Sequence, residues 1–313
     1  MTGMRGNGLR SRRIAAIAVA TVLVSMVTAC GSDDDGGGGI VVTTNVLGDV
    51  VTDLVQGEAD VTVLMQPDAN PHSFGVSARE AAALERADLV IYNGLGLEEG
   101  VLHHVEAAAQ AGVPTFEVAA HVDPIAYGDG ESAGNLDPHF WTDPVRMSVA
   151  VELIGERIAA ELSGVDADRI ARGTAELKAE IDDLHERVEA QFAVIPLDRR
   201  KLITNHHVFG YLAQRYDFTV IGAVIPSGTT LASPSAADLK SLADAVTQAG
   251  VPAVFADSSQ PDRLVRAMAE EAGVHIEVIS LHSESLSEPG GGAETYAAMV
   301  QSNADAITRG LTE

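Results

Sequence analysis

A histidine flanked by prolines is the feature of this sequence that most clearly offers chemistry. His139 directly follows Pro138, and Pro144 comes five residues later. Each proline fixes its own φ angle and restricts the residue before it to extended conformations, so the imidazole has little backbone freedom to lose on binding. Asp143 is expected to cap a helix that begins at Pro144. Such an imidazole could bind a metal ion, transfer a proton or form a buried hydrogen bond.

Three further residues could join His139, because each follows a predicted strand or ends one. His72 lies in a second proline–histidine pair, His206 ends a predicted strand, and Glu284 follows the last strand. The carboxyl ends of parallel strands carry the ligand sites of α/β folds, so the four segments could meet in one crevice. Three imidazoles and one carboxylate suit Zn²⁺, with Mn²⁺ possible, whereas a set without sulfur disfavours Cu(I).

Each candidate also has a plainer interpretation. His139 could be a buried structural histidine, His72 a surface-loop histidine and Glu284 a solvated loop acid. His207 stands beside His206. Adjacent residues at the end of a strand point in different directions, so only one of these two should reach a shared ligand.

The elements that must position these residues alternate between short β-rich runs and helical stretches, and they do so twice. In the first half, strands are expected at 40–44, 59–66, 88–92 and 115–118, with helices at 47–56, 77–86 and 98–111. In the second half, strands are expected at 201–204, 219–225, 253–256 and 275–281, with helices at 208–215, 236–249, 262–272 and 293–309. This alternation predicts an α/β protein of two lobes, each with a mostly parallel four-stranded sheet flanked by helices.

A long helical run from Asp166 to about Ala193 separates the two halves, after a shorter helix at 145–162. Its apolar residues form one stripe, with charged residues on the other side. A helix of about 28 residues is about 42 Å long, so we expect a rigid spine between the lobes and little hinge motion. A dimerising coiled coil would need a longer stripe, and a monomer is therefore expected.

The first 29 residues have the pattern of a secretory signal. Four arginines precede an apolar run at 14–27 that is too short to span a membrane comfortably. Val27-Thr28-Ala29-Cys30 looks like a bacterial lipobox, which implies cleavage before Cys30 and a lipid on its sulfur. An uncleaved anchor helix is the alternative. The signal peptide would occupy 1–29, a flexible tether 30–39, the N-terminal lobe 40–144, the linker helices 145–195 and the C-terminal lobe 196–313.

Composition narrows the possible ligands and partners. Cys30 is the only cysteine, so the exported domain has no disulfide and any metal site must use nitrogen and oxygen donors. The chain has a net charge of -25; removing the four arginines of the signal leaves 16 basic against 45 acidic residues, a net charge of -29. A charge of this sign excludes nucleic acid as a partner.

Three motifs resemble those of a known family. They are Asn70-Pro71-His72-Ser73-Phe74, Asp137-Pro138-His139-Phe140-Trp141-Thr142-Asp143-Pro144 and Asn205-His206-His207-Val208-Phe209-Gly210-Tyr211. They are similar to the metal-ligand motifs of the zinc- and manganese-binding receptors of ABC importers, solute-binding protein family 9. The resemblance runs from about Ile40 to the end and implies the metal ligands His72, His139, His206 and Glu284.

The sequence also departs from the family's pattern. Glu284 stands where the family usually has Asp, and Gly75-Val76 stands where Glu-Pro usually follows the first motif. The loop at 122–136 is acidic and lacks the histidine-rich tract of many zinc-specific members. The longer side chain at 284 could change how the carboxylate binds.

The resemblance implies a receptor that is lipid-anchored at Cys30 outside the cytoplasmic membrane. It would capture Zn²⁺ between two lobes and deliver it to an ABC permease and its ATPase; a manganese receptor is the alternative. Release is expected through local displacement of the Glu284 loop with its glycine run at 290–292. A zinc-dependent hydrolase is less favoured, because the sequence has no His-Glu-x-x-His motif. We therefore expect no enzyme.

Overall fold

The computed structural model describes residues 38–128, 132–225, 228–231, 235–260, 263, 265–266 and 277–312. The expected signal peptide, Cys30, most of the tether and most of the helix expected at 262–272 lie outside the described residues. Within the part of the chain that is described, no helix combines the length and the apolar character needed to cross a lipid bilayer.

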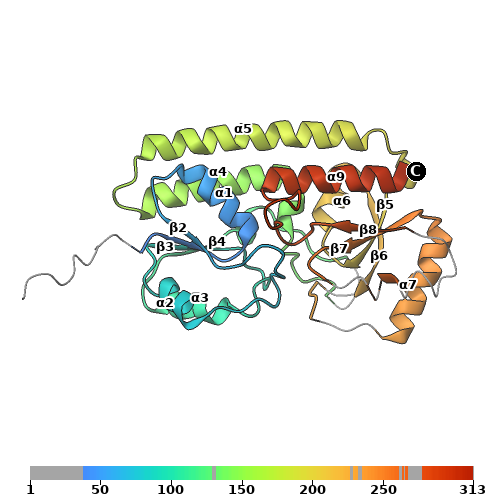
Figure 1. The fold of residues 1–313 in the computed structure, drawn as a ribbon, viewed down its shortest axis with the longest axis horizontal. Coiled ribbons are helices and arrows are strands. Elements are labelled where there is room, and N and C mark those ends of the chain that lie inside the picture. Colours follow the sequence, from blue (N-terminus) through green and yellow to red (C-terminus); the bar gives the residue numbers. More distant parts are fainter. Residues whose placement is uncertain are drawn as a thin grey trace, which may run out of the picture. The chain divides into compact units, whose positions relative to one another are not determined.

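The first half forms a parallel four-stranded sheet in the order β2-β1-β3-β4. Its strands are β1 (Ile40–Val42), β2 (Val61–Val63), β3 (Leu89–Tyr92) and β4 (Thr115–Glu117), and its helices are α1 (Asn45–Val55), α2 (Ala78–Leu84) and α3 (Leu102–Gln110). Alternate side chains enter different cores: Ile40 and Val42 pack with α1, whereas Val41 packs with α2 and α3. Helices therefore cover both faces (Figure 1).

The second half repeats this architecture with a parallel sheet in the order β6-β5-β7-β8. Its strands are β5 (Lys201–His206), β6 (Thr219–Ile225), β7 (Ala253–Asp257) and β8 (Glu277–Leu281), and its helices include α6 (Gly210–Tyr216), α7 (Ala236–Ala249) and α9 (Tyr296–Thr312). Three-residue 3₁₀ helices lie at η1 (Ala119–His121), η2 (Phe140–Thr142) and η3 (Leu197–Arg199). The two parallel four-stranded sheets confirm the predicted fold class.

The local signals at helix starts explain where several elements begin. Ser77 and Glu80 form a reciprocal capping box at α2. The Asp143 side chain accepts a hydrogen bond from the backbone of Val145, and α4 (Pro144–Glu161) begins with its proline. The helix expected from residue 98 begins instead at residue 102. Glu98 is buried, and its carboxylate accepts hydrogen bonds from the backbone N–H groups of Asn93 and Gly94, which holds the chain in a turn.

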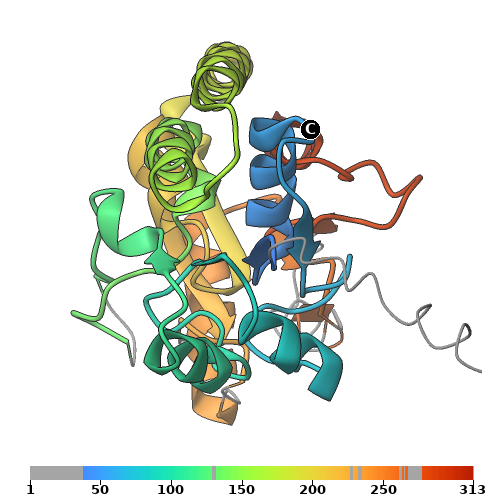
Figure 2. The ribbon, with the colours of Figure 1, turned by 90° about the vertical axis from the view of Figure 1, so that its left-hand side faces the viewer.

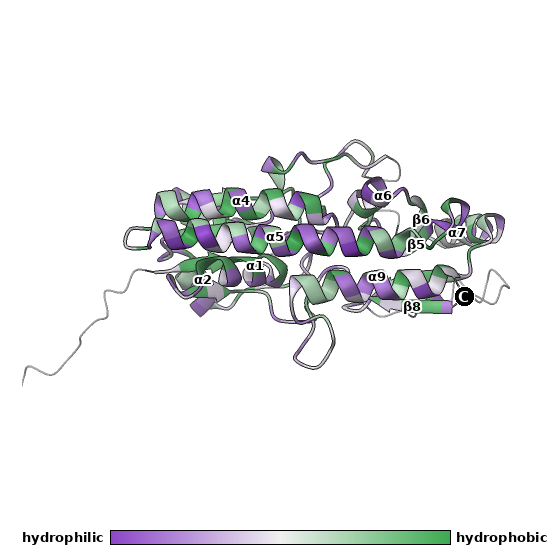
Figure 3. Cartoon of the chain, turned by 90° about the horizontal axis from the view of Figure 1, so that it is seen from above, coloured by the Kyte–Doolittle hydropathy of each residue, from purple (hydrophilic) through white to green (hydrophobic). Residues whose placement is uncertain are grey.

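The long helix α5 (Ala167–Phe192) connects helices of both halves, as expected for a spine. It packs against α4, α1 and α9, and Figure 2 looks along α4 and α5, which lie next to each other. Its buried side chains are Ile170, Ile181, Leu184, Val188 and Phe192. Hydrophilic residues predominate on its outward face, with some apolar residues between them (Figure 3). A Cβ at Gly173 would lie 2.4 Å from the carbonyl oxygen of Leu54, so α1 approaches the spine too closely for a side chain there.

One apolar core extends through both halves. It contains residues of β1 and β3, of β5 and β7, and of the helices α1, α4, α5, α6 and α9. Two smaller cores lie on the other faces of the sheets, one beside α2 and α3 and one beside α7. A hinge between the halves would have to open this shared core to water, which is costly.

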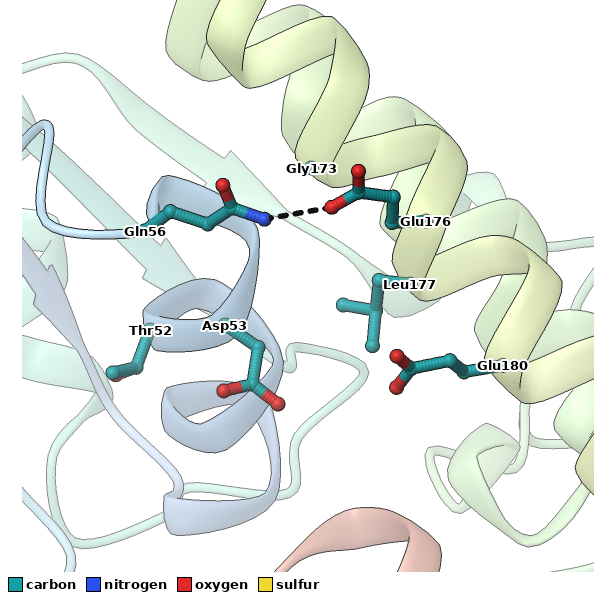
Figure 4. A pocket seen from close by; sticks show the side chains of 7 residues that line it. All are labelled: Thr52, Asp53, Gln56, Gly173, Glu176, Leu177 and Glu180. Atoms are coloured by element: carbon teal, nitrogen blue, oxygen red, sulfur yellow. Dashed lines mark hydrogen bonds between the residues drawn. The ribbon is translucent and has the colours of Figure 1, made fainter.

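A polar hollow of about 340 Å³ separates parts of α1 and α5. The carboxylates of Asp53 and Glu180 face it from opposite helices, and Gln56 Nε2 donates a hydrogen bond of 3.0 Å to Glu176 Oε2 across it (Figure 4). The hollow holds none of the four candidate ligands, so it is separate from the candidate site.

Asp49 joins α1 to the start of α9. Its Oδ2 accepts a hydrogen bond of 2.7 Å from the backbone N–H of Tyr296. Burial disfavours the charged carboxylate and, despite that hydrogen bond, raises the pKa of Asp49 from 3.8 to about 6. Well below pH 4 the group is protonated in the folded and the unfolded chain alike. Between pH 4 and 6 the unfolded chain loses the proton first, so folding becomes less favourable as the pH rises.

Replacing Asp49 with Asn should remove this pH-dependent cost and keep an oxygen acceptor for Tyr296. A pKa rise of this size corresponds to about 3 kcal/mol at full strength, and solvent screening at a partly exposed group reduces it to about 1–2 kcal/mol. Relative to wild type, Asp49→Asn should therefore gain about 1–2 kcal/mol more unfolding free energy at pH 8 than at pH 4, measured by urea denaturation. The matched control Asp182→Asn, at an exposed position of α5, should show no such pH dependence. A larger loss at pH 8 than at pH 4 would contradict the assignment.

Candidate metal centre

Four separate segments bring the candidate residues together. His72 lies in the loop after β2, His139 directly precedes η2, His206 is the last residue of β5, and Glu284 follows β8. All four are at most 1% exposed. One donor atom from each lies within 4.8 Å of the others. The structure thus places together the four residues that the sequence singled out.

The geometry inside the cluster is that of four donors around one point. Glu284 Oε1 lies 2.9 Å from Nε2 of His206 and 3.2 Å from Nε2 of both His72 and His139. The Nε2 atoms of His72 and His139 are 3.4 Å apart. Three imidazole nitrogens and a carboxylate oxygen are a donor set that a divalent cation such as Zn²⁺ accepts in a tetrahedral arrangement.

Charges in the cluster influence one another strongly. Burial lowers the pKa of His72, outweighing the nearby Glu284 carboxylate. Burial alone would raise the pKa of Glu284, but the imidazoles, His206 foremost, hold it well below its usual value. Burial would lower the pKa of His139, yet Asp137 and Glu284 together raise it to about 9. A cation at this point would satisfy the Glu284 carboxylate and would compete with protons for the imidazoles.

His139 has the most complete surroundings of the three imidazoles. Oδ1 of Asp137 lies 2.7 Å from its Nδ1 and accepts a 2.9 Å hydrogen bond from its backbone N–H. The Tyr127 hydroxyl lies 3.2 Å from Nδ1. The Trp141 ring stands edge-on to the imidazole, with ring centroids 5.2 Å apart. Neither Asp137 nor Tyr127 was assigned a role from the sequence. The available signal was the spacing Asp-x-His, because an aspartate side chain can accept a hydrogen bond from the backbone N–H two residues later.

His207, which follows His206 in the sequence, lies outside the cluster. This agrees with the expectation that adjacent residues at the end of a strand point in different directions. His206 is fully buried in the cluster, whereas His207 is half-buried and outside it. The Tyr127 ring lies 6.3 Å from the His207 ring, measured between centroids.

The segment that carries Glu284 is held from several sides. Residues 283–287 are buried. Trp141 Nε1 donates a 2.9 Å hydrogen bond to the carbonyl of Ser283. Asn45 Oδ1 accepts a 3.1 Å hydrogen bond from the backbone of Leu286, and Asn45 Nδ2 lies 2.8 Å from Ser285 Oγ. The glycine run at 290–292 is exposed and lies beyond this buried part. These contacts oppose the expected easy displacement of the Glu284 loop.

Asp257 supports the same segment from within the second sheet. It is buried at the end of β7, where its carboxylate accepts hydrogen bonds from the hydroxyl of Ser283 and, at 3.3 Å, from the backbone of Ser283. Burial, followed by the charge of Glu284, raises the pKa of Asp257. The second sheet therefore positions both His206 and the segment of Glu284.

Asp143 holds the C-terminal end of the motif at 137–144, on the side of His139 opposite to Asp137. Beyond capping α4, its buried carboxylate accepts hydrogen bonds of 2.9 and 3.0 Å from Arg215 of α6 and one of 2.7 Å from Arg146. The hydrogen bonds to Asp143 raise the pKa of Arg215. The ion pair with Arg215 fixes the chain after His139 against the second half of the protein.

The protein is similar to known proteins along nearly its whole length. It is 30% identical over 310 residues to the zinc-binding protein TroA of Treponema pallidum, covering 97% of this chain and 99% of that protein. It is 28% identical over 320 residues to the manganese-binding lipoprotein MntA of Bacillus subtilis, covering 97% and 100%. The solved structure of the periplasmic zinc-binding protein TroA from Treponema pallidum superposes with a TM-score of 0.79 at 28% identity, covering 88% of this chain and 99% of that one.

A family model described as "ZnuA: Zinc-uptake complex component A periplasmic" matches residues 40–310. This confirms the resemblance carried by the three motifs. The chain belongs to the family of the periplasmic component A of zinc-uptake complexes.

Proposed function

We propose that this protein is an extracytoplasmic receptor that captures Zn²⁺ through His72, His139, His206 and Glu284 and delivers it to an ABC permease with its ATPase. The observation that carries the proposal is the convergence of four buried donors on one point, with Glu284 Oε1 within 3.2 Å of three Nε2 atoms. Family membership supports the role in uptake. The ion is the cargo in this proposal, so binding has to be reversible.

Zinc is the proposed cargo because three nitrogens and one oxygen match its usual four-coordinate shell. Manganese is the second candidate, since several relatives are named as manganese-binding lipoproteins. Glu284 Oε2 is buried and has no hydrogen-bond partner among the described residues, so it is placed to add a second carboxylate oxygen. Mn²⁺ favours oxygen-rich shells more than Zn²⁺ does.

We propose no enzymatic activity. Hydrolytic zinc sites have three protein ligands and keep one position for water. Four protein donors would fill a tetrahedral shell here, which suits capture of the ion rather than activation of a water molecule.

We also propose the organisation that follows from the sequence. Residues 1–29 are a signal peptide, Cys30 carries a lipid, and 30–39 tether the domain to the outer face of the cytoplasmic membrane. The N-terminal lobe, linker and C-terminal lobe occupy 40–144, 145–195 and 196–313. The protein would act as a monomer, since the apolar stripe of α5 is already buried within the chain.

His139→Ala should weaken Zn²⁺ binding severely. The purified mature wild-type protein should bind about one Zn²⁺, measured by competition with a chromophoric chelator. A zinc site with four ligands contributes about 10–16 kcal/mol, so loss of one ligand should cost about 3 kcal/mol, or about 100-fold in affinity. His103→Ala, at an exposed position of α3, is the matched control and should bind as wild type does. Equal affinities of wild type and His139→Ala would refute the ligand assignment.

The coordination shell separates the two candidate ions. X-ray absorption of the zinc-loaded protein should show four ligands, three nitrogens and one oxygen, at about 2.0–2.2 Å. Affinity alone is a poor guide, because most nitrogen and oxygen sites bind Zn²⁺ more tightly than Mn²⁺. Selective binding of Mn²⁺ when both ions are buffered at equal free concentrations would instead favour the manganese receptor.

Cys30→Ala should release the protein from the membrane. The wild-type chain, expressed in a bacterium that processes lipoproteins, should fractionate with membranes because its covalent lipid inserts into them. Cys30→Ala should appear in the soluble exported fraction, while Ser32→Ala should behave as wild type. Retention of Cys30→Ala in alkali-washed membranes would favour an uncleaved anchor helix.

A further inference from the structure

The three imidazoles of the cluster differ in what supports their outer nitrogen. Nδ1 of His72 and Nδ1 of His206 are buried without a hydrogen-bond partner among the described residues. Nδ1 of His139 has two neighbours, the Asp137 carboxylate at 2.7 Å and the Tyr127 hydroxyl at 3.2 Å. The three imidazoles therefore present the same atom, Nε2, to the centre of the cluster. They differ in the groups that hold each ring in place.

The contact with Asp137 determines which nitrogen of His139 carries a proton. An ionised carboxylate only accepts hydrogen bonds, so the 2.7 Å contact requires a proton on Nδ1. In the neutral ring, the lone pair is then on Nε2, the atom that faces Glu284 at 3.2 Å. An imidazole whose Nδ1 has no partner is free to place its proton on either nitrogen, and with the proton on Nε2 that nitrogen cannot bind a metal.

Asp137 is itself held in place by its surroundings. It is buried, its backbone N–H donates a 2.8 Å hydrogen bond to the carbonyl of Ile125, and its carbonyl accepts one of 2.6 Å from the Tyr211 hydroxyl. A Cβ at Gly210 would lie 2.8 Å from Asp137 Oδ2. The carboxylate therefore fits a space that is left by the absent side chain at the start of α6.

We propose that Asp137 is a positioning residue that keeps a proton on Nδ1 of His139 and holds the ring so that Nε2 is the nitrogen that faces the cation. His139 is then the ligand that is oriented before the cation arrives, whereas the orientation of His72 and His206 is completed by the cation itself. The inference rests on the proposed function of the same site, and it concerns a residue that does not itself contact the ion.

Two substitutions of Asp137 distinguish the effect of its negative charge from the effect of its hydrogen bonds to the ring and the backbone of His139. Asp137→Asn keeps an oxygen that can accept from Nδ1–H and from the backbone of His139, but it removes the charge. Asp137→Ala removes both acceptors. Loss of such an outer partner typically costs about 10–100-fold in metal affinity. We expect this loss of Zn²⁺ affinity for Asp137→Ala, with one ion still bound, and a loss of less than about 10-fold for Asp137→Asn.

A proton resonance provides a readout that does not depend on bound metal. A His139 Nδ1–H that donates to a buried carboxylate should give a downfield, slowly exchanging proton signal in nitrogen-15 correlated spectra of the metal-free protein. The signal should be present in wild type and in Asp137→Asn and absent from Asp137→Ala. A purely structural role for Asp137 would change the thermal midpoint without this pattern.

Gly210→Ala tests the same contact without altering Asp137. Its methyl group should displace the carboxylate and weaken Zn²⁺ binding, although alanine is the better helix former at the start of α6. This variant keeps the test decisive if Asp137→Ala fails to fold.

Unchanged Zn²⁺ affinity in Asp137→Ala or in Gly210→Ala, or a Nδ1–H signal that persists in Asp137→Ala, would overturn the inference. Failure of the wild type to bind Zn²⁺ or Mn²⁺ would refute the proposed function instead, and the metal-free spectra would still decide the role of Asp137.

Discussion

A carboxylate buried among three imidazoles is the constraint on which the rest of the structure depends. Removing an ionised carboxyl group from water is costly unless an opposite charge or several donors replace the lost hydration. Glu284 is fully buried, and the groups that face it are the Nε2 atoms of His72, His139 and His206. Its other oxygen has no partner among the described residues. The site is therefore arranged around a positive charge, which a divalent cation supplies most completely.

Four donors from distant segments stay together only if each segment is fixed independently. Hydrogen bonds that cross between the halves fulfil this requirement: Asn45 binds the segment of Glu284, Arg215 binds Asp143, and Asp49 binds the start of α9. The apolar core continues through both halves beside α5. The site and the spine thus oppose motion for different reasons. Specific hydrogen bonds hold the site, and an extensive apolar core holds the spine.

Much of this arrangement could be predicted from sequence, because its signals are local. Pro144 after Asp143 marks the start of α4, and the capping box at Ser77 marks the start of α2, because both act on residues close in the sequence. The alternation of side chains at the end of β5 likewise separates His206 from His207. Other contacts have no local signal. Asn45 and Leu286 are 241 positions apart, and their hydrogen bond exists only once both sheets are formed. The start of α3 was misplaced because the carboxylate of Glu98 is used in a buried turn, a tertiary effect that overrides helix propensity.

The burial of all four proposed ligands sets a condition on release. A cation at Glu284 Oε1 cannot exchange with water while the ligands remain at most 1% exposed. The sequence suggested that the Glu284 loop moves together with its glycine run, but residues 283–287 are buried and are bonded to Asn45, Trp141 and Asp257. Moving them breaks several buried hydrogen bonds together, each costing about 1–3 kcal/mol when left unpaired. We therefore expect spontaneous loss of an ion bound at the proposed site to be slow in this conformation. A partner that binds the protein more tightly in an open conformation would supply the required free energy through its differential affinity for the two states. A receptor that must hold its cargo until it meets a permease needs this property, and the network around Glu284 provides it without a hinge in the spine.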